Sequence, residues 1–407
     1  MVLDNIRYFE LSENQKYMLH PSAIALFSLI KIKKRSLKDF EEEFRDFISY
    51  HPSLCTIFNT RGDIVIQAYV KPAKVKVRFV YELSINDSKE INQVLLAPFN
   101  VFDEEIIRVV VVENKNEIGL YISMPYAIID AQSKLILSKD IKTHFDGDIK
   151  LERQSFSNLD FIKSQKKFLV SKEGEANRRY WREVLKSYTI GNGVFLPQGD
   201  KNKYVSQKFI VTEAHFEKLN SVTNKFKLPV TAIMLGFFQN LISLLYSESL
   251  FFNVRMNGRD NSYIDLDANN FVGVMNNTLP IPVLKNTSID IKKYLYECFG
   301  IYCEARMNQR VPFTVIDQDF NKIHNSNIDQ FIAGTFNFNV LEGDLVVSRN
   351  HTKKNKEIYA KESIILNCYQ HNNALELELL CLNEIYNKNS TLLDLPSYLG
   401  LFLKILE

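Results

Sequence analysis

The chain has 407 residues, of which 46% are hydrophobic, enough to form the cores of two domains of ordinary size. Its 50 basic and 48 acidic residues leave a formal net charge of +2, so neither nucleic acid nor an anionic membrane is an expected partner. The five cysteines show no metal-binding or redox spacing, and no signal peptide is visible. We therefore expect a cytoplasmic protein with reduced thiols, no metal and no membrane span.

Helix and strand patterns alternate in the first third of the chain. Ser12 and Gln15 form a capping box, which predicts the start of a helix. Asp130 is expected to be the N-cap of a later one. Amphipathic patterns predict helices at residues 37–50 and 131–141, and strands at residues 64–70, 75–80, 106–112 and 118–124, the last two joined by a hairpin turn.

The second half repeats this alternation after a polar segment at residues 146–158. The apolar stretch at residues 228–246 contains Pro229, Gln239 and Asn240, which favours a buried helix over a membrane span. Further helices are expected at residues 160–170, 213–226 and 390–406, and strands at residues 206–211, 250–256, 332–340, 358–368 and 375–382. These patterns predict a mixed α/β (α+β) protein with two halves, residues 1–165 and 166–407, each a sheet with covering helices.

Seven short motifs follow one another in order and extend over essentially the whole chain. Together they resemble the condensation domains of non-ribosomal peptide synthetases, which belong to the chloramphenicol-acetyltransferase-like superfamily. The segments are Leu11–Leu19 with Ser12 and Gln15, Tyr50–Phe58, Met124–Ser133, Tyr180-Trp181, Gly258-Arg259, Val272–Pro280 and Asn308–Phe313.

The resemblance implies two chloramphenicol-acetyltransferase-like lobes in a V shape with a tunnel between them. It implies that carrier proteins present an acyl group and an amine on phosphopantetheine arms, that the amine attacks the acyl thioester, and that no cofactor is bound. In this family the second histidine of a His-His-x-x-x-Asp-Gly loop is usually assigned the role of base or of positioning the amine.

This chain differs from the family at that loop. Pro125 and Tyr126 occupy the two histidine positions, Asp130 the aspartate position and Ala131 the glycine position. The family's aspartate pairs with an arginine whose place here falls on Pro282, so we expect Asp130 to lack that ion pair. Its expected role is then structural, as a helix cap that contributes about 1 kcal/mol.

Tyr126 is the candidate catalytic residue left in the loop, although forming a phenolate from a tyrosine with pKa about 10 costs roughly 4 kcal/mol at neutral pH. A hydrogen-bonding or space-filling role in the tunnel is therefore preferred to a role as general base. His51 and Cys55 are expected near the loop on the family fold and are assigned to the substrate tunnel, with a Cys–His nucleophile as an alternative.

The remaining residues assigned to the tunnel with Pro125 and Ala131 are Arg259, Asn276 and Asn277. The two asparagines are candidates to hydrogen-bond a pantetheine arm, and the alternative is that they only form a turn between strands.

Three functional hypotheses follow. The first is an atypical acyltransferase that forms an amide from a carrier-protein thioester by aligning its substrates, without the usual histidine. The second is a catalytically inactive domain that binds a carrier protein or recruits a tailoring enzyme. The third is an acyltransferase that uses a small soluble amine or alcohol.

Overall fold

A computed structural model describes residues 6–81, 88–103, 105–147, 151–188, 202–246, 250–259, 268–284, 290–341, 351–358, 362–372 and 374–406. The chain divides into two compact units, Met1–Glu175 with Asn257–Asn277, and Ala176–Met256 with Thr278–Glu407. The division thus falls later than the expected boundary at residue 165. It also assigns Asn257–Asn277 to the first unit, because hydrogen bonds described below fix this segment to the loop at Asp130.

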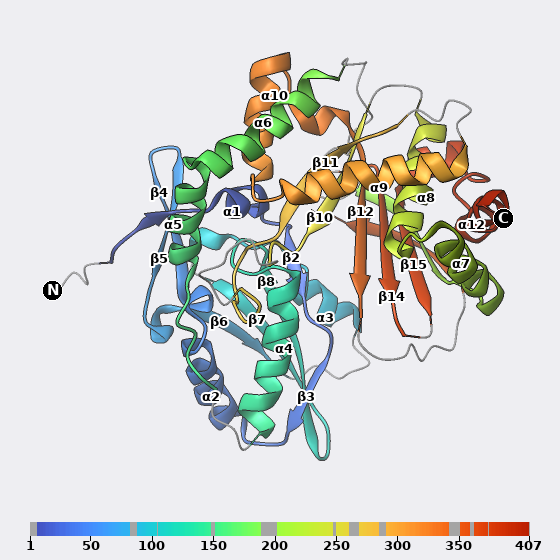
Figure 1. Ribbon diagram of the computed structural model, residues 1–407. Helices are drawn as coiled ribbons and strands as arrows, with labels where there is room; N and C mark the ends of the chain where they lie inside the picture. Colours follow the sequence, from blue (N-terminus) through green and yellow to red (C-terminus); the bar gives the residue numbers. More distant parts are fainter. Residues whose placement is uncertain are drawn as a thin grey trace. The chain divides into compact units, whose positions relative to one another are not determined.

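The first unit contains a five-stranded and a three-stranded sheet (Figure 1). The five-stranded sheet has the order β2-β8-β7-β6, with β3 also paired to β8, and only β6 and β7 are parallel. Its strands are β2 (Ile24–Leu26), β3 (Ile30–Lys33), β6 (Lys76–Val80), β7 (Glu105–Glu113) and β8 (Glu117–Pro125). The hairpin turn expected between β7 and β8 is confirmed, since Asn114 N donates to Glu117 O at 2.9 Å.

Helices cover both faces of this sheet. Val109 and Val111 of β7 belong to the core that includes residues of α2 and α4, whereas Val110 and Val112 pack with residues of α3. A strand buried on both faces is apolar throughout instead of alternating, which explains the continuous valine run. The helices of the first unit are α1 (Glu13–Met18), α2 (Leu37–Ser49), α3 (Ser88–Leu95), α4 (Ala131–Asp146) and α5 (Asn158–Leu169), with short 3₁₀ helices η1 (Pro52–Cys55), η2 (Pro72–Lys74) and η3 (Val101–Asp103).

The three-stranded sheet has the order β1-β5-β4, and all its pairs are antiparallel. Its strands are β1 (Phe9–Glu10), β4 (Thr56–Arg61) and β5 (Ile64–Tyr69). Only β5 was predicted. β1, β2 and β3 have two to four residues each, too few for a repeating pattern, so their pairing partners define them.

The second unit is built on a seven-stranded sheet with the order β11-β10-β12-β14-β15-β9-β13. β10, β12 and β14 run parallel, while β14, β15, β9 and β13 pair antiparallel. The strands are β9 (Asn202–Ile210), β10 (Phe251–Met256), β11 (Asn277–Pro282), β12 (Ile332–Val340), β13 (His351–Ile358), β14 (Ile364–Gln370) and β15 (Leu375–Leu382).

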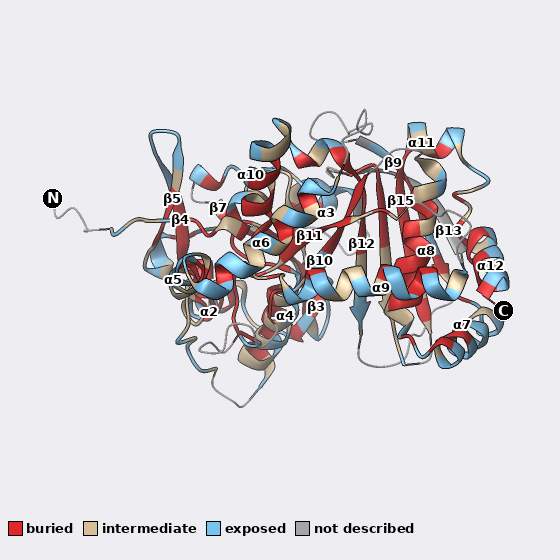
Figure 2. Cartoon of the chain, turned by 45° about the horizontal axis from the view of Figure 1, so that its top comes forward, coloured by how far each residue is buried: buried red, intermediate tan, exposed pale blue. Residues whose placement is uncertain are grey.

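The apolar helix predicted near residues 228–246 is α8 (Val230–Leu245), and it is buried over most of its length (Figure 2). It packs on the sheet through Phe238, whose ring contacts Phe252 of β10 and Phe336 of β12. The other elements are α6 (Lys172–Lys186), α7 (Glu213–Phe226), α9 (Ile291–Met307), α10 (Phe313–His324), η4 (Ile328–Phe331), α11 (Asn383–Lys388) and α12 (Leu395–Leu406).

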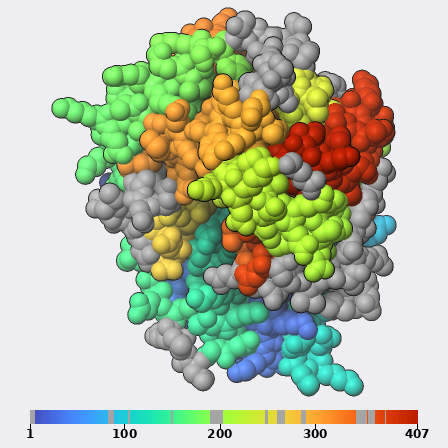
Figure 3. Space-filling view, turned by 45° about the vertical axis from the view of Figure 1, so that its right-hand side comes forward, coloured from blue at the N-terminus to red at the C-terminus, as the bar shows by residue number. Residues whose placement is uncertain are grey.

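Parts of α7, α8, α9 and α12 form one continuous surface of this unit (Figure 3). Within the described residues, no single helix is long and apolar enough to cross a membrane. α7 and α8 reach that length only together, and the chain bends by 103° between them.

Candidate functional site

The loop at residues 124–133 connects β8 to α4, and backbone hydrogen bonds determine its path. Pro125 is the last residue of β8 and lies opposite Ile24 of β2. Tyr126 N donates to Ala23 O at 2.9 Å, and Ile128 N donates to Pro125 O at 3.1 Å. The half-buried Tyr126 side chain packs against the core of the first unit. Pro125 and Tyr126 therefore both belong to an ordered turn.

Asp130 is the N-cap of α4, as predicted, because its Oδ1 accepts from Ser133 N at 2.8 Å. Its second oxygen, Oδ2, accepts from Met275 N at 3.0 Å and Asn276 N at 3.3 Å. The carboxylate thus joins the start of α4 to a segment more than a hundred residues later in the chain.

The expectation that Asp130 lacks an arginine partner was wrong. Arg259 Nη2 donates to Asp130 Oδ1 at 2.6 Å, and the two side chains are 2% and 1% exposed. Arg259 Nη1 also donates to the carbonyl oxygens of Ala268 at 2.9 Å and Phe271 at 2.7 Å. The arginine of the Gly-Arg motif therefore forms the ion pair although Pro282 stands at the expected place. Its guanidinium is buried in this pair instead of lining a substrate channel.

Ser133 and Gly273 complete this network. The Ser133 hydroxyl lies 2.7 Å from both Asp130 Oδ1 and Gly273 O, and it accepts from Gly273 N at 2.9 Å and Arg259 Nη2 at 3.0 Å. A Cβ on Gly273 would lie 2.1 Å from the Phe271 ring, so a larger residue there would force its neighbours to shift. We call Asp130, Ser133, Arg259 and Gly273, with the amides of Met275 and Asn276, the Asp130 hub.

Two further motifs reach the loop and the hub from the N-terminal end of the chain. Gln15 Nε2 donates to Ala127 O at 3.0 Å, and Gln15 forms a reciprocal amide pair with Gln67. Asn14 Nδ2 donates to Asn276 O at 2.6 Å. Ser53 of the second motif donates to the carbonyl oxygen of Val272 at 2.6 Å.

Five of the seven motifs therefore meet inside the first unit. The capping box predicted at Ser12 and Gln15 is confirmed, but the wider role of Gln15 was not anticipated. A sequence pattern shows which residues recur in a motif, whereas their contacts depend on the tertiary fold.

His51 and Cys55 lie in the core of the first unit, 2% and 5% exposed. Burial lowers the pKa of His51 to about 4 and raises the pKa of the Cys55 thiol to about 11, so both are uncharged at neutral pH. His51 Nε2 lies 3.5 Å from Asp140 Oδ2. Since a thiolate is the reactive form of cysteine, this geometry does not favour a Cys–His nucleophile.

The other residues assigned to the tunnel differ in exposure. Ala131 is the exposed first residue of α4, and Asn277 is a buried residue at the start of β11. Asn276 contributes its backbone amide and carbonyl to the network. Its side-chain Oδ1 is buried without a hydrogen-bond partner among the described residues.

The two remaining motifs meet inside the second unit. Trp181 is 1% exposed and donates from Nε1 to Asn308 O at 3.0 Å. Nearby on α6, Arg178 makes two 2.6 Å hydrogen bonds to Asp319, and Arg182 adds one at 3.2 Å. Burial acts to raise the pKa of Asp319, but hydrogen bonds and charge from Arg178 and Arg182 outweigh it and hold that pKa below its usual value.

A row of polar side chains crosses the sheet of the second unit, and sequence reasoning missed it. Asn337 Nδ2 donates to Asn367 Oδ1 at 2.7 Å, and Asn367 Nδ2 lies 3.4 Å from Glu378 Oε2. Ser206 donates to the other Glu378 oxygen at 3.1 Å. The available signal was the alternation of polar and apolar residues along β12 and β15. Within the described residues, no group of three His, Cys, Asp or Glu could hold a metal ion.

Comparison with solved structures identifies the class of fold, which is the chloramphenicol-acetyltransferase-like fold. The epimerization domain from the third module of tyrocidine synthetase B has a TM-score of 0.75 at 12% identity, with 98% of each chain covered. The SgcC5 protein from Streptomyces globisporus has a TM-score of 0.71 at 14% identity, again with 98% of each chain covered. The domain that mediates chain release from the enacyloxin polyketide synthase has a TM-score of 0.73 at 14% identity, covering 99% of this chain and 83% of that one.

The family follows from the sequence itself. The model of the condensation domain matches residues 10–388, so the chain belongs to the condensation-domain family. No curated protein sequence gives a significant match.

Proposed function

We propose that this chain is an atypical acyltransferase that forms an amide from a carrier-protein thioester without a histidine base. The observation that carries the proposal is the Asp130 hub. Its carboxylate is fully hydrogen-bonded and paired with Arg259, which stabilises the loop although Pro125 and Tyr126 stand at the histidine positions. A loop held this precisely suits a site that works by positioning its reactants.

The proposed reaction needs two substrates, each presented on a phosphopantetheine arm. The nitrogen of an uncharged amine attacks the thioester carbonyl, the C–N bond forms, and the C–S bond breaks. The sulfur leaves on the donor arm as a thiolate, and the proton lost from nitrogen passes to that thiolate or to water. A general base typically contributes about 10² to 10⁴-fold, whereas alignment of two bound reactants can provide effective molarities of about 10⁵ M or more.

The residues of the loop have separate roles in this proposal. Asp130 and Arg259 are positioning residues, because both side chains are buried against protein groups. Tyr126 packs beside the reacting groups or hydrogen-bonds to them through its hydroxyl. Asn276, whose Oδ1 has no hydrogen-bond partner among the described residues, accepts hydrogen bonds from the amides of a pantetheine arm, with Asn277 beside it.

Turnover is tested with acyl- and aminoacyl-pantetheine thioesters, followed by mass spectrometry of the amide product. We expect a rate above the uncatalysed reaction. In the double variant Pro125→His/Tyr126→His, the rate should rise by roughly 10² to 10⁴-fold, because a base is restored to a loop that is already ordered. The control is Tyr126→Phe, which keeps the ring and removes only the hydroxyl. No product above background from either the original chain or the double variant would exclude the enzyme proposal.

The second candidate function is a non-catalytic domain of a synthetase pathway in the cytoplasm that binds a carrier protein or recruits a tailoring enzyme. It is favoured by the turn at Pro125 and Tyr126, which supplies structure and contains no histidine. Calorimetry with loaded carrier proteins distinguishes the two functions, because binding without product supports this one. A product formed with a free amine or alcohol, in the absence of an aminoacyl arm, would support the third hypothesis of a soluble acceptor.

A further inference from the structure

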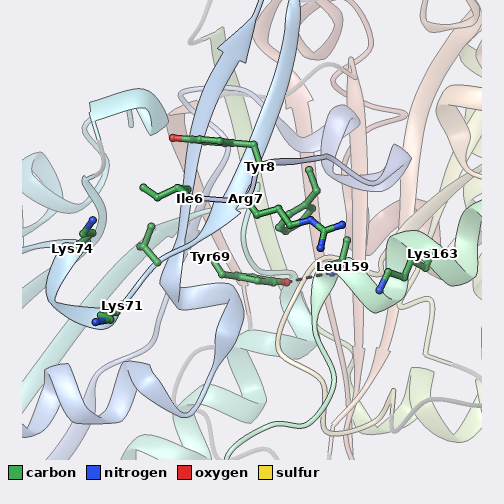
Figure 4. Close-up of a pocket in the computed structure, with 10 residues that line it drawn as sticks. Ile6, Arg7, Tyr8, Tyr69, Lys71, Lys74, Leu159 and Lys163 are labelled. Carbon is green, nitrogen blue, oxygen red and sulfur yellow. Dashed lines mark hydrogen bonds between the residues drawn. The ribbon is translucent and has the colours of Figure 1, made fainter. Parts of the chain in front are cut away.

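The first unit carries a pocket of about 580 Å³ on the three-stranded sheet, distinct from the Asp130 hub (Figure 4). Three segments line it: the chain entering β1, the end of β5 with η2, and the first turns of α5. Its lining residues are Ile6, Arg7, Tyr8, Phe9, Tyr69, Val70, Lys71, Lys74, Leu159 and Lys163. A pocket of this volume is large enough for a small organic ligand.

Positive charge is concentrated in this pocket. Four of the lining residues are cationic and none is acidic, in a chain whose formal net charge is only +2. Lys71 and Lys74 lie on one side of Tyr69, and Lys163 lies on the other, with Arg7 between (Figure 4). Cations gathered around a concave surface create a positive potential there that attracts anions.

The carboxylates closest in sequence to the lining residues are engaged with other groups. Glu10 pairs with Lys166 at 2.7 Å, and hydrogen bonding to Lys166 lowers the pKa of Glu10. Asp160 accepts from the Ser157 hydroxyl at 2.6 Å. These contacts direct the two acidic groups to partners that do not line the pocket.

Aromatic rings supply a second kind of contact. Phe9 and Tyr69 have ring centroids 5.2 Å apart at an interplanar angle of 52°, and Tyr8 adds a third ring to the lining. The Tyr69 hydroxyl accepts from Leu159 N at the start of α5, at 3.3 Å. Burial raises the pKa of Tyr69 to about 12, so its ring carries no negative charge to oppose an anion.

We propose that this pocket binds a phosphate ester with a planar aromatic group, a ligand of the nucleotide class. Arg7, Lys71 and Lys163 contact the phosphates, since guanidinium and ammonium groups both recognise them. The rings of Phe9, Tyr8 and Tyr69 pack against the aromatic group. The site is separate from the proposed acyl transfer and does not depend on it.

The test is calorimetric titration of the full chain with ADP, pyrophosphate and adenosine. ADP should bind more tightly than either fragment, and its affinity should fall as salt is added. Lys163→Gln should weaken ADP binding roughly two- to fivefold, as expected for one exposed charge contact. Phe9→Leu should weaken ADP binding roughly fivefold or more and leave pyrophosphate binding unchanged, because ADP carries a base to stack and pyrophosphate does not.

Lys166→Gln is the matched control. Lys166 lies one turn further along α5, is exposed like Lys163, and is already paired with Glu10, so its loss should not weaken ADP binding. Three results would overturn the proposal: no binding of ADP, equal weakening by Lys166→Gln and Lys163→Gln, or a hexaglutamate peptide binding as tightly as ADP. The last result would show a charged surface for acidic protein segments instead of a nucleotide site.

Discussion

Arg259 Nη2 lies 2.6 Å from Asp130 Oδ1, and the two buried residues are separated by 129 positions in the sequence. Gly258, which precedes the arginine, has φ of +68°, a conformation that favours glycine. A Cβ there would also lie 2.0 Å from Met275 O. Gly258 and Arg259 therefore act together, because the glycine permits the turn that brings the arginine to the aspartate.

Replacing Arg259 by methionine should destabilise the protein by about 3–5 kcal/mol, because it leaves the Asp130 carboxylate buried without its counter-charge. Urea unfolding followed by circular dichroism measures the change. Arg255→Met is the control, since the Arg255 side chain is 45% exposed and its 3.8 Å contact with Glu362 is longer than a hydrogen bond, so its loss should destabilise the protein less. Similar losses in the two variants would contradict the structural role assigned to Arg259.

Two glycine-to-alanine substitutions should change the stability of the protein in opposite directions. Gly273→Ala should destabilise the chain by about 1–3 kcal/mol, since the new methyl group would overlap the Phe271 ring and force a shift. Gly300→Ala should stabilise it by about 0.5–1 kcal/mol, because Gly300 lies inside α9 with no described atom within 4 Å of the added carbon and alanine is the better helix former. Thermal unfolding of both variants tests these predictions. A loss of stability in Gly300→Ala as large as that in Gly273→Ala would refute them.

His51 should make the stability of the protein depend on pH. Burial lowers its folded-state pKa to about 4 from an ordinary value of 6.5, so between these values the unfolded chain binds more protons. Stability should therefore rise as pH increases from about 4 to 6.5 and be lost as pH falls through that window. Denaturant unfolding of the original chain and of His51→Leu measures it, since the difference between the two isolates this group. If the unfolding free energies of the two proteins changed with pH in parallel, His51 would not be the group responsible.

In the second unit, Arg178 and Arg182 of α6 should contribute unequally to the stability of the protein. Arg178 makes two 2.6 Å bonds to Asp319, whereas Arg182 makes one at 3.2 Å. Arg178→Gln should cost about 1.5–3 kcal/mol as a charged hydrogen-bond pair is lost, and Arg182→Gln should cost less. Chemical unfolding of the single and double variants gives the coupling between them. If Arg182→Gln lowered the stability as much as Arg178→Gln or more, the two hydrogen bonds from Arg178 would not be what stabilises Asp319.

Local patterns predicted the long elements of the fold well. The helix Glu213–Phe226 and the strands Ile332–Val340 and Leu375–Leu382 have the bounds expected from their periodicity. These segments bury one face over several turns or residue pairs, so the pattern repeats often enough to be read. The capping role of Asp130 was also predictable, because its partner Ser133 is only three residues away.

The candidate site was predictable only in part. The order of motifs identified the family, but the resemblance misplaced the partner of Asp130, because it assigned the arginine to the position of Pro282 and the structure pairs Asp130 with Arg259. It also placed His51 and Cys55 near substrate, whereas both are core residues. Alignment with a family pattern locates residues along the chain, but exposure and pairing depend on how the neighbouring elements pack.

The sequence alone thus determined the fold class and the family, because both depend on residue types and their local spacing. Only the tertiary structure decided that Asp130 keeps an arginine. That ion pair closes a loop of more than a hundred residues, and no local signal marks which of several arginines will reach a buried carboxylate. Burial then stabilises the pairing, because an uncompensated charge in the core is far less stable than a paired one.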